Sequence, residues 1–387
     1  MMPVNRVVVI GATGSIGRQA LEVIARFPAE LELVGAVAGR RAMALAEALL
    51  PFPAARAVVV DPQDQVPEGM AVGPDAACEL AASRDADVIL VGGGGAGALL
   101  PTLAACETGA FLAVATKEVL VMAGELVTAT AAAHHTTILP VDSEHSAIWQ
   151  CLRGERPDSV ARLLLTASGG PFRSTPLDEI PNASREQALA HPNWRMGPKV
   201  TIDSATMMNK GLEVIEAHFL FGLPYDVIDV VVHPQSAVHS AVEFCDGTLI
   251  AQLGIPDMRA PIALALSGGR RLPGVVPPLQ LTQGARLDFE PLDPRRYPAL
   301  EVARRAAARG GGVPAAMNAA NEVAVAAFLE GRIAFGGIAE VVAEVSDSYP
   351  AQPVRTLAEV LAADAAGRRQ ARDLVPEVAI SPTRVAP

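Results

Sequence analysis

The chain contains few cysteines, few aromatic residues and no excess of basic residues. Among 387 residues there are 4 cysteines and 4% aromatic residues, and 31 Lys and Arg stand against 42 Asp and Glu, for a net charge of −11. This acidic balance argues against nucleic acid and against an anionic membrane surface as the main partner. The cysteines are scattered and form no C-x-x-C pair, so the sequence indicates neither a disulfide framework nor a thiolate zinc site.

Long apolar runs are also absent. The chain does not open on a basic segment followed by an apolar stretch, and no later run is both long enough and free enough of polar residues to span a membrane. We therefore expect a cytoplasmic protein without a membrane partner. Half of the residues are hydrophobic, so a chain of this length can bury large cores and form two or three domains.

The first 141 residues alternate apolar strands with helix-length segments, which predicts a Rossmann-like, doubly wound parallel sheet. A glycine-rich turn, Gly11–Gly17, follows the first strand and opens a helical pattern. Its backbone N–H groups would face the pyrophosphate of a dinucleotide, although the G-x-x-G-x-x-G spacing is only moderately specific. Strands are expected at 6–10, 33–38, 57–61, 86–91, 111–115 and 136–141.

The residues after the second predicted strand indicate which dinucleotide binds. An NAD site usually has an acidic residue there, which accepts a hydrogen bond from the ribose 2′-hydroxyl. This chain instead has Gly39-Arg40-Arg41, which places two cations where a 2′-phosphate would lie. The pattern favours NADP(H); the alternative is a pair of ordinary surface arginines.

Candidate metal ligands follow the last strand of this predicted sheet. Alternate residues of an extended segment face the same side, so Asp142 and Glu144 are expected to converge. Two neighbouring carboxylates repel each other unless a proton or a cation lies between them. With Glu213 they would offer three hard oxygen ligands, which suit Mg²⁺ or Mn²⁺. A D-x-E pair alone is weak, and His145 is interpreted as a structural histidine rather than a fourth ligand.

The segment Thr201–Glu216 is predicted to form one helix with Ser204 as its N-cap. Gly211 within it should cost about 1 kcal/mol relative to Ala, which indicates that something approaches the backbone there. An ordinary solvated helix face is the alternative interpretation. At about 100° per residue, an amide, an ammonium group and carboxylates would point the same way: Asn209, Lys210, Glu213 and Glu216.

These motifs occur in the order found in the 1-deoxy-D-xylulose 5-phosphate reductoisomerase family, which the chain resembles over most of its length. Thr116 and Arg41 depart from the family pattern, because Asn is common at both positions, and these differences bear on single NADPH contacts. The matching segments are Gly11–Gly17, Ala115–Glu118, Val141–His145, Ala167–Phe172, His191–Gly197, Asp203–Glu213, His233–Ser236, Pro256–Arg259 and Asn318–Glu322.

The resemblance implies which residues hold each ligand. It implies a divalent metal, Mg²⁺ or Mn²⁺, at Asp142, Glu144 and Glu213, and it adds Lys117 and His191 to these three as catalytic residues. It implies contacts with a sugar phosphate substrate from Lys117, Ser143, Glu144, Ser168, His191, Trp194, Ser204, Asn209, Lys210 and Glu213. It implies NADPH contacts from Thr13, Gly14, Ser15, Ile16, Gly39, Arg40, Arg41, Thr116, Glu118 and Gly197.

The implied reaction is the metal-dependent isomerisation and NADPH-linked reduction of 1-deoxy-D-xylulose 5-phosphate to 2-C-methyl-D-erythritol 4-phosphate, in isoprenoid precursor biosynthesis by the non-mevalonate pathway. A cation chelated by a ketone and its neighbouring hydroxyl supports the rearrangement, and NADPH supplies hydride. Two alternatives remain open. A metal-free NADP-dependent dehydrogenase would leave the three carboxylates without a role, and a non-catalytic NADPH-binding regulator would turn nothing over.

The rest of the chain is expected to complete an α/β protein with three domains. The NADPH-binding domain, residues 1–141, is followed by a central α+β catalytic domain, residues 142–266. The central domain has a lid loop around 185–198 and a hairpin around Asp246-Gly247. Its sheet is a natural surface for the homodimer that the family forms. A linker, residues 267–294, leads to a C-terminal helical domain, residues 295–387, whose last dozen residues are expected to form a loose tail.

The dibasic pair makes cofactor preference testable. If Arg40 and Arg41 bind the 2′-phosphate, the protein should have a higher kcat/KM for NADPH than for NADH. Arg40→Asp should then reduce this preference by about tenfold or more, because a charge-assisted hydrogen bond is lost and a repulsive charge is added. Steady-state kinetics with both cofactors measure the ratio. Equal kcat/KM values for the two cofactors in the unchanged protein would show that the arginines are ordinary surface residues.

Overall fold

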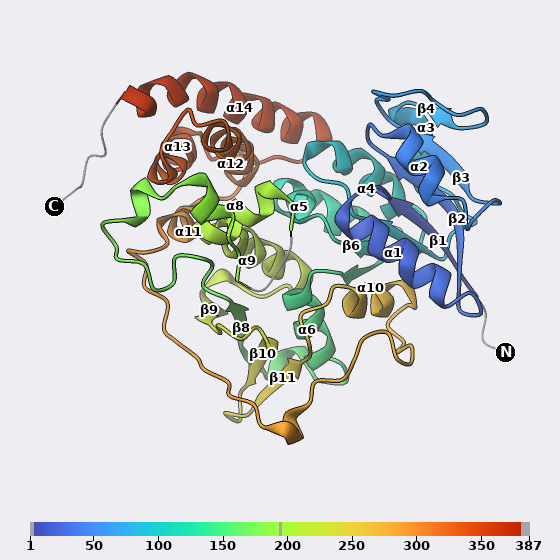
Figure 1. Ribbon diagram of the computed structural model, residues 1–387, viewed down its shortest axis with the longest axis horizontal. Coiled ribbons are helices and arrows are strands. Elements are labelled where there is room, and N and C mark those ends of the chain that lie inside the picture. The colour runs from blue at the N-terminus through green and yellow to red at the C-terminus, as the bar shows by residue number, and fades with distance from the viewer. Residues whose placement is uncertain (1–3, 193–195, 381–387) are drawn as a thin grey trace. The chain divides into compact units, whose positions relative to one another are not determined.

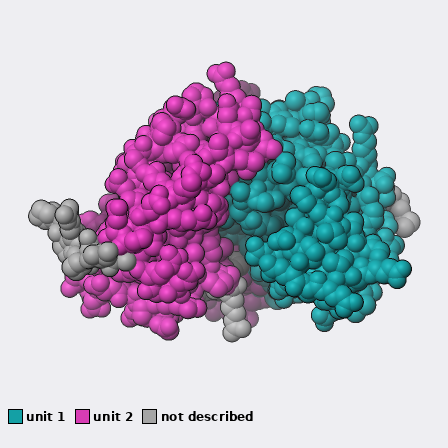
Figure 2. Space-filling view, turned by 90° about the horizontal axis from the view of Figure 1, so that it is seen from above, with its two compact units in different colours: residues 1–119, 125–149, 257–279 teal, residues 120–124, 150–256, 280–387 magenta. Residues whose placement is uncertain are grey.

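The structure is a computed structural model and describes residues 4–192 and 196–380. The chain forms two compact units, coloured separately in Figure 2. The sequence analysis divides the chain differently, into four consecutive segments that differ in their secondary structure. That division stays a prediction. Unit 1 comprises Met1–Val119, Glu125–Trp149 and Asp257–Leu279, and unit 2 comprises Leu120–Gly124, Gln150–Pro256 and Gln280–Pro387.

Unit 1 is built on a parallel sheet of seven strands in the order β4-β3-β2-β1-β5-β6-β7 (Figure 1). This order confirms the predicted Rossmann-like, doubly wound sheet. The sequence pattern missed only β4, because two residues are too few for a periodicity to show. The strands are β1 (Asn5–Ile10), β2 (Leu31–Ala38), β3 (Arg56–Val59), β4 (Ala71–Val72), β5 (Val88–Val91), β6 (Phe111–Val114) and β7 (Thr137–Pro140).

Helices cover both faces of this sheet, which explains why its strands are continuously apolar. On one face, Val7 of β1 lies in a buried cluster with Ile24 of α1 and Ile262 of α10. On the other, Gly35 of β2 leaves room for α3, since a Cβ at Gly35 would lie 2.6 Å from the Leu80 side chain. The helices in or entering this unit are α1 (Ser15–Arg26), α2 (Ala42–Ala48), α3 (Pro74–Ala81), α4 (Leu99–Cys106), α5 (Lys117–Ala133), α6 (Ser143–Cys151) and α10 (Arg259–Leu266).

Unit 2 contains a second sheet, of four strands in the order β11-β10-β8-β9. Its strands are β8 (Val160–Ala167), β9 (Ile228–Val232), β10 (Val238–Phe244) and β11 (Leu249–Leu253). The predicted hairpin is present as β10 and β11, but its turn has three residues rather than two. The Phe244 N–H donates to the Thr248 carbonyl at 2.9 Å, and Gly247 has a φ of +83°. A three-residue turn that ends in a left-handed glycine suits the twist of a hairpin.

The other regular structure of unit 2 is helical (Figure 1). The C-terminal part of the chain is helical, as predicted, with helices α11 to α14. Within the described residues, no helix is long and apolar enough to cross a membrane. The helices of this unit are α7 (Arg185–Leu189), α8 (Pro198–Thr206), α9 (Met208–Phe221), α11 (Pro298–Arg309), α12 (Val313–Leu329), α13 (Phe335–Ser348) and α14 (Leu357–Ile380).

The segment that the sequence predicts as one helix forms two, α8 and α9. Met207 between them has a left-handed backbone with φ +62°, and the Thr206 hydroxyl accepts from the Met208 N–H at 3.2 Å. Gly197 is the N-cap of α8, so the predicted N-cap, Ser204, instead lies in the last turn of that helix. Helix propensity could not predict this break, because methionine favours helices and only tertiary contacts hold it in a left-handed conformation.

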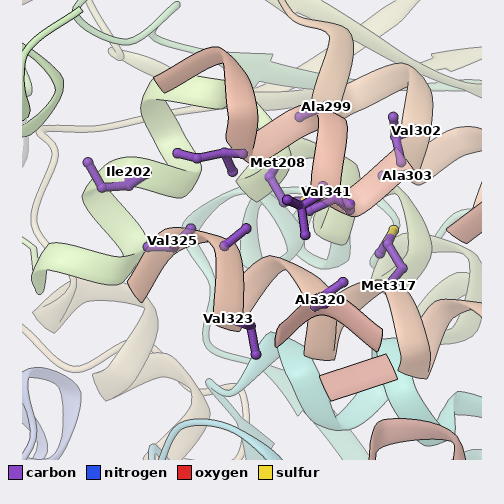
Figure 3. Close-up of a cluster of buried hydrophobic side chains, with 14 of the residues drawn as sticks. Ile202, Met208, Ala299, Val302, Ala303, Met317, Ala320, Val323, Val325 and Val341 are labelled. Atoms are coloured by element: carbon purple, nitrogen blue, oxygen red, sulfur yellow. The ribbon is translucent and has the colours of Figure 1, made fainter. Parts of the chain in front are cut away.

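Helices α8 and α9 pack on the C-terminal helices through apolar side chains. Ile202 and Met208 are buried with Ala303 of α11, Met317 of α12 and Val341 of α13 (Figure 3). The sequence prediction that something approaches the backbone at Gly211 is confirmed. A Cβ at Gly211 would lie 2.4 Å from the Ala303 Cβ, so helix α11 itself is the neighbour.

The end of the chain is more ordered than predicted. Helix α14 continues to Ile380 and includes Pro376, which was assigned to a loose tail. Val375 is buried and Val378 packs against the same core, so apolar contacts hold the last turns in place despite the proline. Residues 381–387 lie outside the described part of the chain.

The close contact at Gly211 predicts how a substitution there changes stability. Gly211→Ala should lower the free energy of unfolding by about 1–2 kcal/mol, because overpacking outweighs the gain of about 1 kcal/mol in helix propensity. Urea denaturation measures the difference. Gly97→Ala is the control, since a Cβ at Gly97 would meet no atom within 4 Å. A Gly211→Ala protein more stable than the unchanged chain would contradict the tight α9–α11 packing.

Candidate active site

The glycine-rich turn of unit 1 brings backbone atoms too close for side chains. Gly11 has a φ of +83°, and a Cβ there would lie 2.6 Å from the Gly93 nitrogen. A Cβ at Gly17 would lie 2.3 Å from the Gly11 carbonyl oxygen, so the turn packs directly on the start of α1. Helix α1 begins after Gly14, has no side-chain cap and has no acidic residue in its first turn. Its N-terminal N–H groups and partial positive charge are therefore suited to an anion.

The two arginines after β2 behave differently. The Arg41 guanidinium donates to the Thr13 carbonyl at 2.6 Å, which links the start of α2 to the glycine-rich turn. Arg40 is exposed, and its Nε lies 3.8 Å from an Asp61 carboxylate oxygen. Thr13 and Arg41 also line a pocket of about 450 Å³, which residues of α1 and α2 surround. Gly39 before the arginines is exposed and has no atom within 4 Å of a would-be Cβ.

Thr116 joins two loops at the edge of the sheet where the strands end. Its buried hydroxyl donates to the Gly93 carbonyl, and the Val91 carbonyl lies 3.3 Å away. Lys117 and Glu118 follow in the first turn of α5. Threonine at this position, where the family pattern favours Asn, therefore ties the loop after β5 to the end of β6.

Asp142 and Glu144 converge, but for a different reason from the one predicted. Strand β7 ends at Pro140, and α6 begins at Ser143, so the segment is a helix start rather than an extended strand. The Asp142 carbonyl accepts the first helical hydrogen bond, from the Ser146 N–H at 2.8 Å, and its side chain accepts from the Ser143 N–H at 3.0 Å. One oxygen of Asp142 and one of Glu144 lie within 4.8 Å of each other.

Basic groups surround this pair of carboxylates. The Lys117 ammonium donates to Asp142, and the buried His145 has its Nδ1 3.8 Å from the same carboxylate. Strands β6 and β7 are parallel neighbours, and these side chains follow their carboxyl ends, where open α/β sheets bind ligands. The Ser143 hydroxyl donates to Glu144 at 2.5 Å, which further orders the pair.

In unit 2, Ser168 lies on a turn that follows β8. Its hydroxyl is 3.2 Å from His191 Nε2 and accepts from the Gly170 N–H, also at 3.2 Å. A Cβ at Gly170 would lie 2.9 Å from the Ser204 carbonyl, so the turn lies directly against α8. Burial lowers the pKa of His191 below its usual value, which favours the neutral imidazole.

Helix α9 gathers the predicted amide, ammonium and carboxylate groups. Asn209 donates to one Glu213 oxygen at 2.7 Å, and Lys210 donates to the other at 2.5 Å. Lys210 also donates to the Thr166 carbonyl at the end of β8, at 2.6 Å. Lys210 is 3% exposed and Glu213 0%, so this is a buried polar cluster rather than a solvated helix face.

Other candidates have different outcomes. Gly197 is the N-cap of α8. Trp194 lies outside the described residues. Two contributors were not predicted: Thr166, which acts through its carbonyl, and Tyr297, whose hydroxyl donates to the Gly169 carbonyl at 2.8 Å. A backbone carbonyl such as that of Thr166 does not depend on the residue type, so the sequence cannot reveal it. Tyr297 is too distant in sequence for a local pattern to connect it with the turn.

The seven-stranded parallel sheet, its glycine-rich turn and the lysine–carboxylate set at its edge define a dinucleotide-dependent oxidoreductase. Models of 1-deoxy-D-xylulose 5-phosphate reductoisomerase, of its C-terminal domain and of the DXP reductoisomerase C-terminal domain match residues 7–124, 138–221 and 253–370. The reductoisomerase of Anaeromyxobacter sp. (strain K) is 50% identical over 383 residues, which cover 96% of this chain and 97% of that relative.

Solved structures agree with this similarity. The Zymomonas mobilis reductoisomerase in complex with NADPH has a TM-score of 0.89 and 42% identity, over 96% of this chain and 99% of that one. A DOX-P reductoisomerase in complex with NADPH, fosmidomycin and magnesium has a TM-score of 0.91 and 36% identity, over 98% and 100%. The chain therefore belongs to the 1-deoxy-D-xylulose 5-phosphate reductoisomerase family. Its function is the NADPH-linked conversion of 1-deoxy-D-xylulose 5-phosphate to 2-C-methyl-D-erythritol 4-phosphate.

The lowered pKa of His191 predicts a pH effect on stability. Below about pH 6.5 the unfolded chain binds a proton at this histidine before the folded chain does. Stability should therefore be complete above this pH and fall as the pH decreases toward the folded-state pKa, and His191→Asn should make the fall shallower. Melting temperatures across this range measure the slope, with His134→Asn at an exposed histidine as the control. An unchanged slope in His191→Asn would contradict the burial of a neutral imidazole.

Proposed function

We propose that this chain catalyses the family reaction with the residues that the sequence predicted, each in the role that its surroundings support. The observation that carries the proposal is the carboxylate pair Asp142 and Glu144 beside the Lys117 ammonium, at the carboxyl ends of β6 and β7. A pair of like charges at the ligand-binding edge of such a sheet calls for a cation.

NADPH would bind to unit 1 through the glycine-rich turn and α1. The uncapped start of α1 suits the pyrophosphate, with contacts from Thr13, Gly14, Ser15 and Ile16. Arg41 is fixed against this turn and Arg40 is exposed beside Asp61, so both can serve the 2′-phosphate, next to Gly39. Thr116, Glu118 and Gly197 complete the proposed contacts, and Thr116 contributes by holding the loop after β5.

The residues present fit a divalent metal. Asp142 and Glu144 offer hard oxygen donors whose mutual repulsion Mg²⁺ or Mn²⁺ would relieve, and Glu213 is the proposed third ligand. Asn209 and Lys210 each donate to one Glu213 oxygen, which fixes the orientation of the carboxylate. When bound, the metal acts as a Lewis acid on the substrate ketone and hydroxyl, and NADPH supplies the hydride.

The substrate phosphate would be held in unit 2 by Ser168, Ser204, Asn209 and Lys210. Glu213 and the Thr166 carbonyl hold the Lys210 ammonium in place, where its charge can attract a phosphate oxygen. Neutral His191 contacts the Ser168 hydroxyl and would lie beside the phosphate group of the bound substrate. Trp194, outside the described residues, stays a predicted substrate contact.

Lys117 and Ser143 would act at the reacting end of the substrate. The Lys117 side chain donates to Asp142, and from this position it can stabilise negative charge that develops on a substrate oxygen. The Ser143 hydroxyl orders Glu144 and is available to hydrogen-bond a substrate hydroxyl. These fixed groups align the carbon skeleton, so that binding energy serves the rearrangement.

The chain is further proposed to form a homodimer in the cytoplasm. Strand β11 is an edge of its sheet and exposes Leu249 and Ile250, at 58% and 40% of their surface. Phe289 is 52% exposed in the same unit. Exposed edge strands with apolar side chains favour pairing with another chain. Cys78, Cys106, Cys151 and Cys245 are free thiols, which fits a reducing compartment.

The proposal predicts the effect of one substitution at the metal ligands. Glu213→Gln should abolish NADPH oxidation with 1-deoxy-D-xylulose 5-phosphate and Mg²⁺ or Mn²⁺, because the amide is a poor metal ligand. NADPH affinity, measured by fluorescence titration without substrate, should hardly change. Excess chelator should likewise stop the unchanged enzyme. Full activity in the variant or with chelator would contradict the three-carboxylate site and favour a metal-free dehydrogenase.

Glu322→Gln is the matched control for this experiment. Like Glu213, Glu322 accepts from an asparagine four residues earlier, Asn318, at 3.2 Å, and from a cation, Arg368, at 2.6 Å. Glu322→Gln should cost less stability than Glu213→Gln, because Arg368 keeps two hydrogen bonds to Asp364, so urea denaturation of both variants is measured beside activity. Only Glu213→Gln should lose turnover. Equal loss of activity in both would attribute the effect to folding instead.

A further inference from the structure

Tyr297 is linked to both segments that carry the proposed phosphate ligands, by a hydrogen bond to one and a shared buried cluster with the other. It directly precedes α11 and is 2% exposed, with its hydroxyl donating to the Gly169 carbonyl at 2.8 Å. Its ring lies in a small buried cluster with Ala167, at the end of β8, and with Met207, at the break between α8 and α9. One side chain therefore bonds to the Ser168 turn and shares a buried cluster with the helix break.

The turn itself has little intrinsic rigidity. Gly169 and Gly170 have φ values of +85° and +64°, which glycine adopts at little cost and also leaves easily. The hydrogen bond from Tyr297 fixes the peptide between these glycines, directly after Ser168. Burial raises the pKa of Tyr297 to about 12, so its hydroxyl stays protonated and can donate.

Neighbours of Tyr297 hold the far end of the same turn. Arg296 donates to the Phe172 carbonyl at 2.8 Å and also to the Thr175 carbonyl. Arg173 pairs with Glu290 at 2.6 Å, so a further side chain from the segment that leads into α11 contacts the turn. The turn that presents Ser168 is thus bound at both ends by residues more than a hundred positions away.

The helix break also depends on this cluster. Met207 is left-handed although it is not glycine, a conformation that costs roughly 1–2 kcal/mol and persists only where packing enforces it. Ser204 lies before the break, and Asn209 and Lys210 lie after it. The buried cluster that contains Tyr297 and Met207 therefore lies at the junction between the helices that carry these three side chains.

We propose that Tyr297, supported by Arg296, is a positioning residue that holds the Ser168 turn and the α8–α9 break in register for a dianionic phosphate. This inference rests on the proposed phosphate site in unit 2. Tyr297 itself contacts no substrate atom in this role. Its hydroxyl orders the backbone that carries the ligands, so it should matter only for substrates that bear the phosphate.

Tyr297→Phe tests this role, because the ring and its packing remain. We expect kcat/KM for 1-deoxy-D-xylulose 5-phosphate to fall about 3- to 10-fold, the range for one lost hydrogen bond. With 1-deoxy-D-xylulose, which lacks the phosphate, kcat/KM should stay within about twofold, since no phosphate needs alignment. The KM for NADPH should not change. Tyr349→Phe, which removes a hydroxyl elsewhere in unit 2, is the control and should affect neither substrate.

Two results would overturn the inference. Equal losses with both substrates would make Tyr297 a general structural residue, and no loss with either would show that the hydroxyl does not order the turn. The unchanged enzyme tests the proposed phosphate site separately. If its kcat/KM is equal for the two substrates, the proposed phosphate site is wrong, and so is this inference.

A second variant covers the case in which Tyr297→Phe fails to fold. Arg296→Gln shortens the side chain that donates to Phe172 and Thr175, and it leaves the buried cluster around Tyr297 untouched. It should also lower kcat/KM for the phosphorylated substrate severalfold and spare the unphosphorylated one. An equal effect of Arg296→Gln on both substrates would count against the role of this segment.

Discussion

The buried pair of Lys210 and Glu213 is the constraint on which unit 2 depends. Two opposite charges with almost no exposure are expensive to remove from water, and the cost is recovered only with good geometry and additional hydrogen bonds. Asn209 and the Thr166 carbonyl provide those bonds, so helix α9 is tied to the end of β8 at one point. Loss of either charge would leave the other unpaired in the interior, at a cost of about 3–5 kcal/mol.

Much of the fold could be predicted because it follows from patterns that are local. Strands that are buried on both faces are apolar throughout, and helices that are buried on one face have apolar residues at helical spacing. Both patterns can be seen in the sequence of the element itself. The break at Met207 and the order of Pro376 could not be predicted in this way. In both places contacts with distant residues override the local preference, and nothing in the neighbouring sequence signals those contacts.

The candidate site shows the same division between local and distant causes. The spacing of Asn209, Lys210 and Glu213 on a helix is a local property, and the three side chains do interact. The convergence of Asp142 and Glu144 was predicted, but from an extended geometry that is wrong, since Asp142 begins a helix there. Tyr297 was missed because its partner, Gly169, is 128 positions away in the sequence.

The Ser168 turn has a consequence for how this enzyme can evolve under inhibitor pressure. Its wall is made of backbone at Gly169 and Gly170, and any side chain there would meet Arg173 or the Ser204 carbonyl while adopting an unfavourable φ. Substitutions at these two glycines would distort the turn and lower the activity of the enzyme, whether or not they weaken the binding of an inhibitor. A compound that binds against this backbone would therefore contact a surface that substitutions at these two positions cannot easily change.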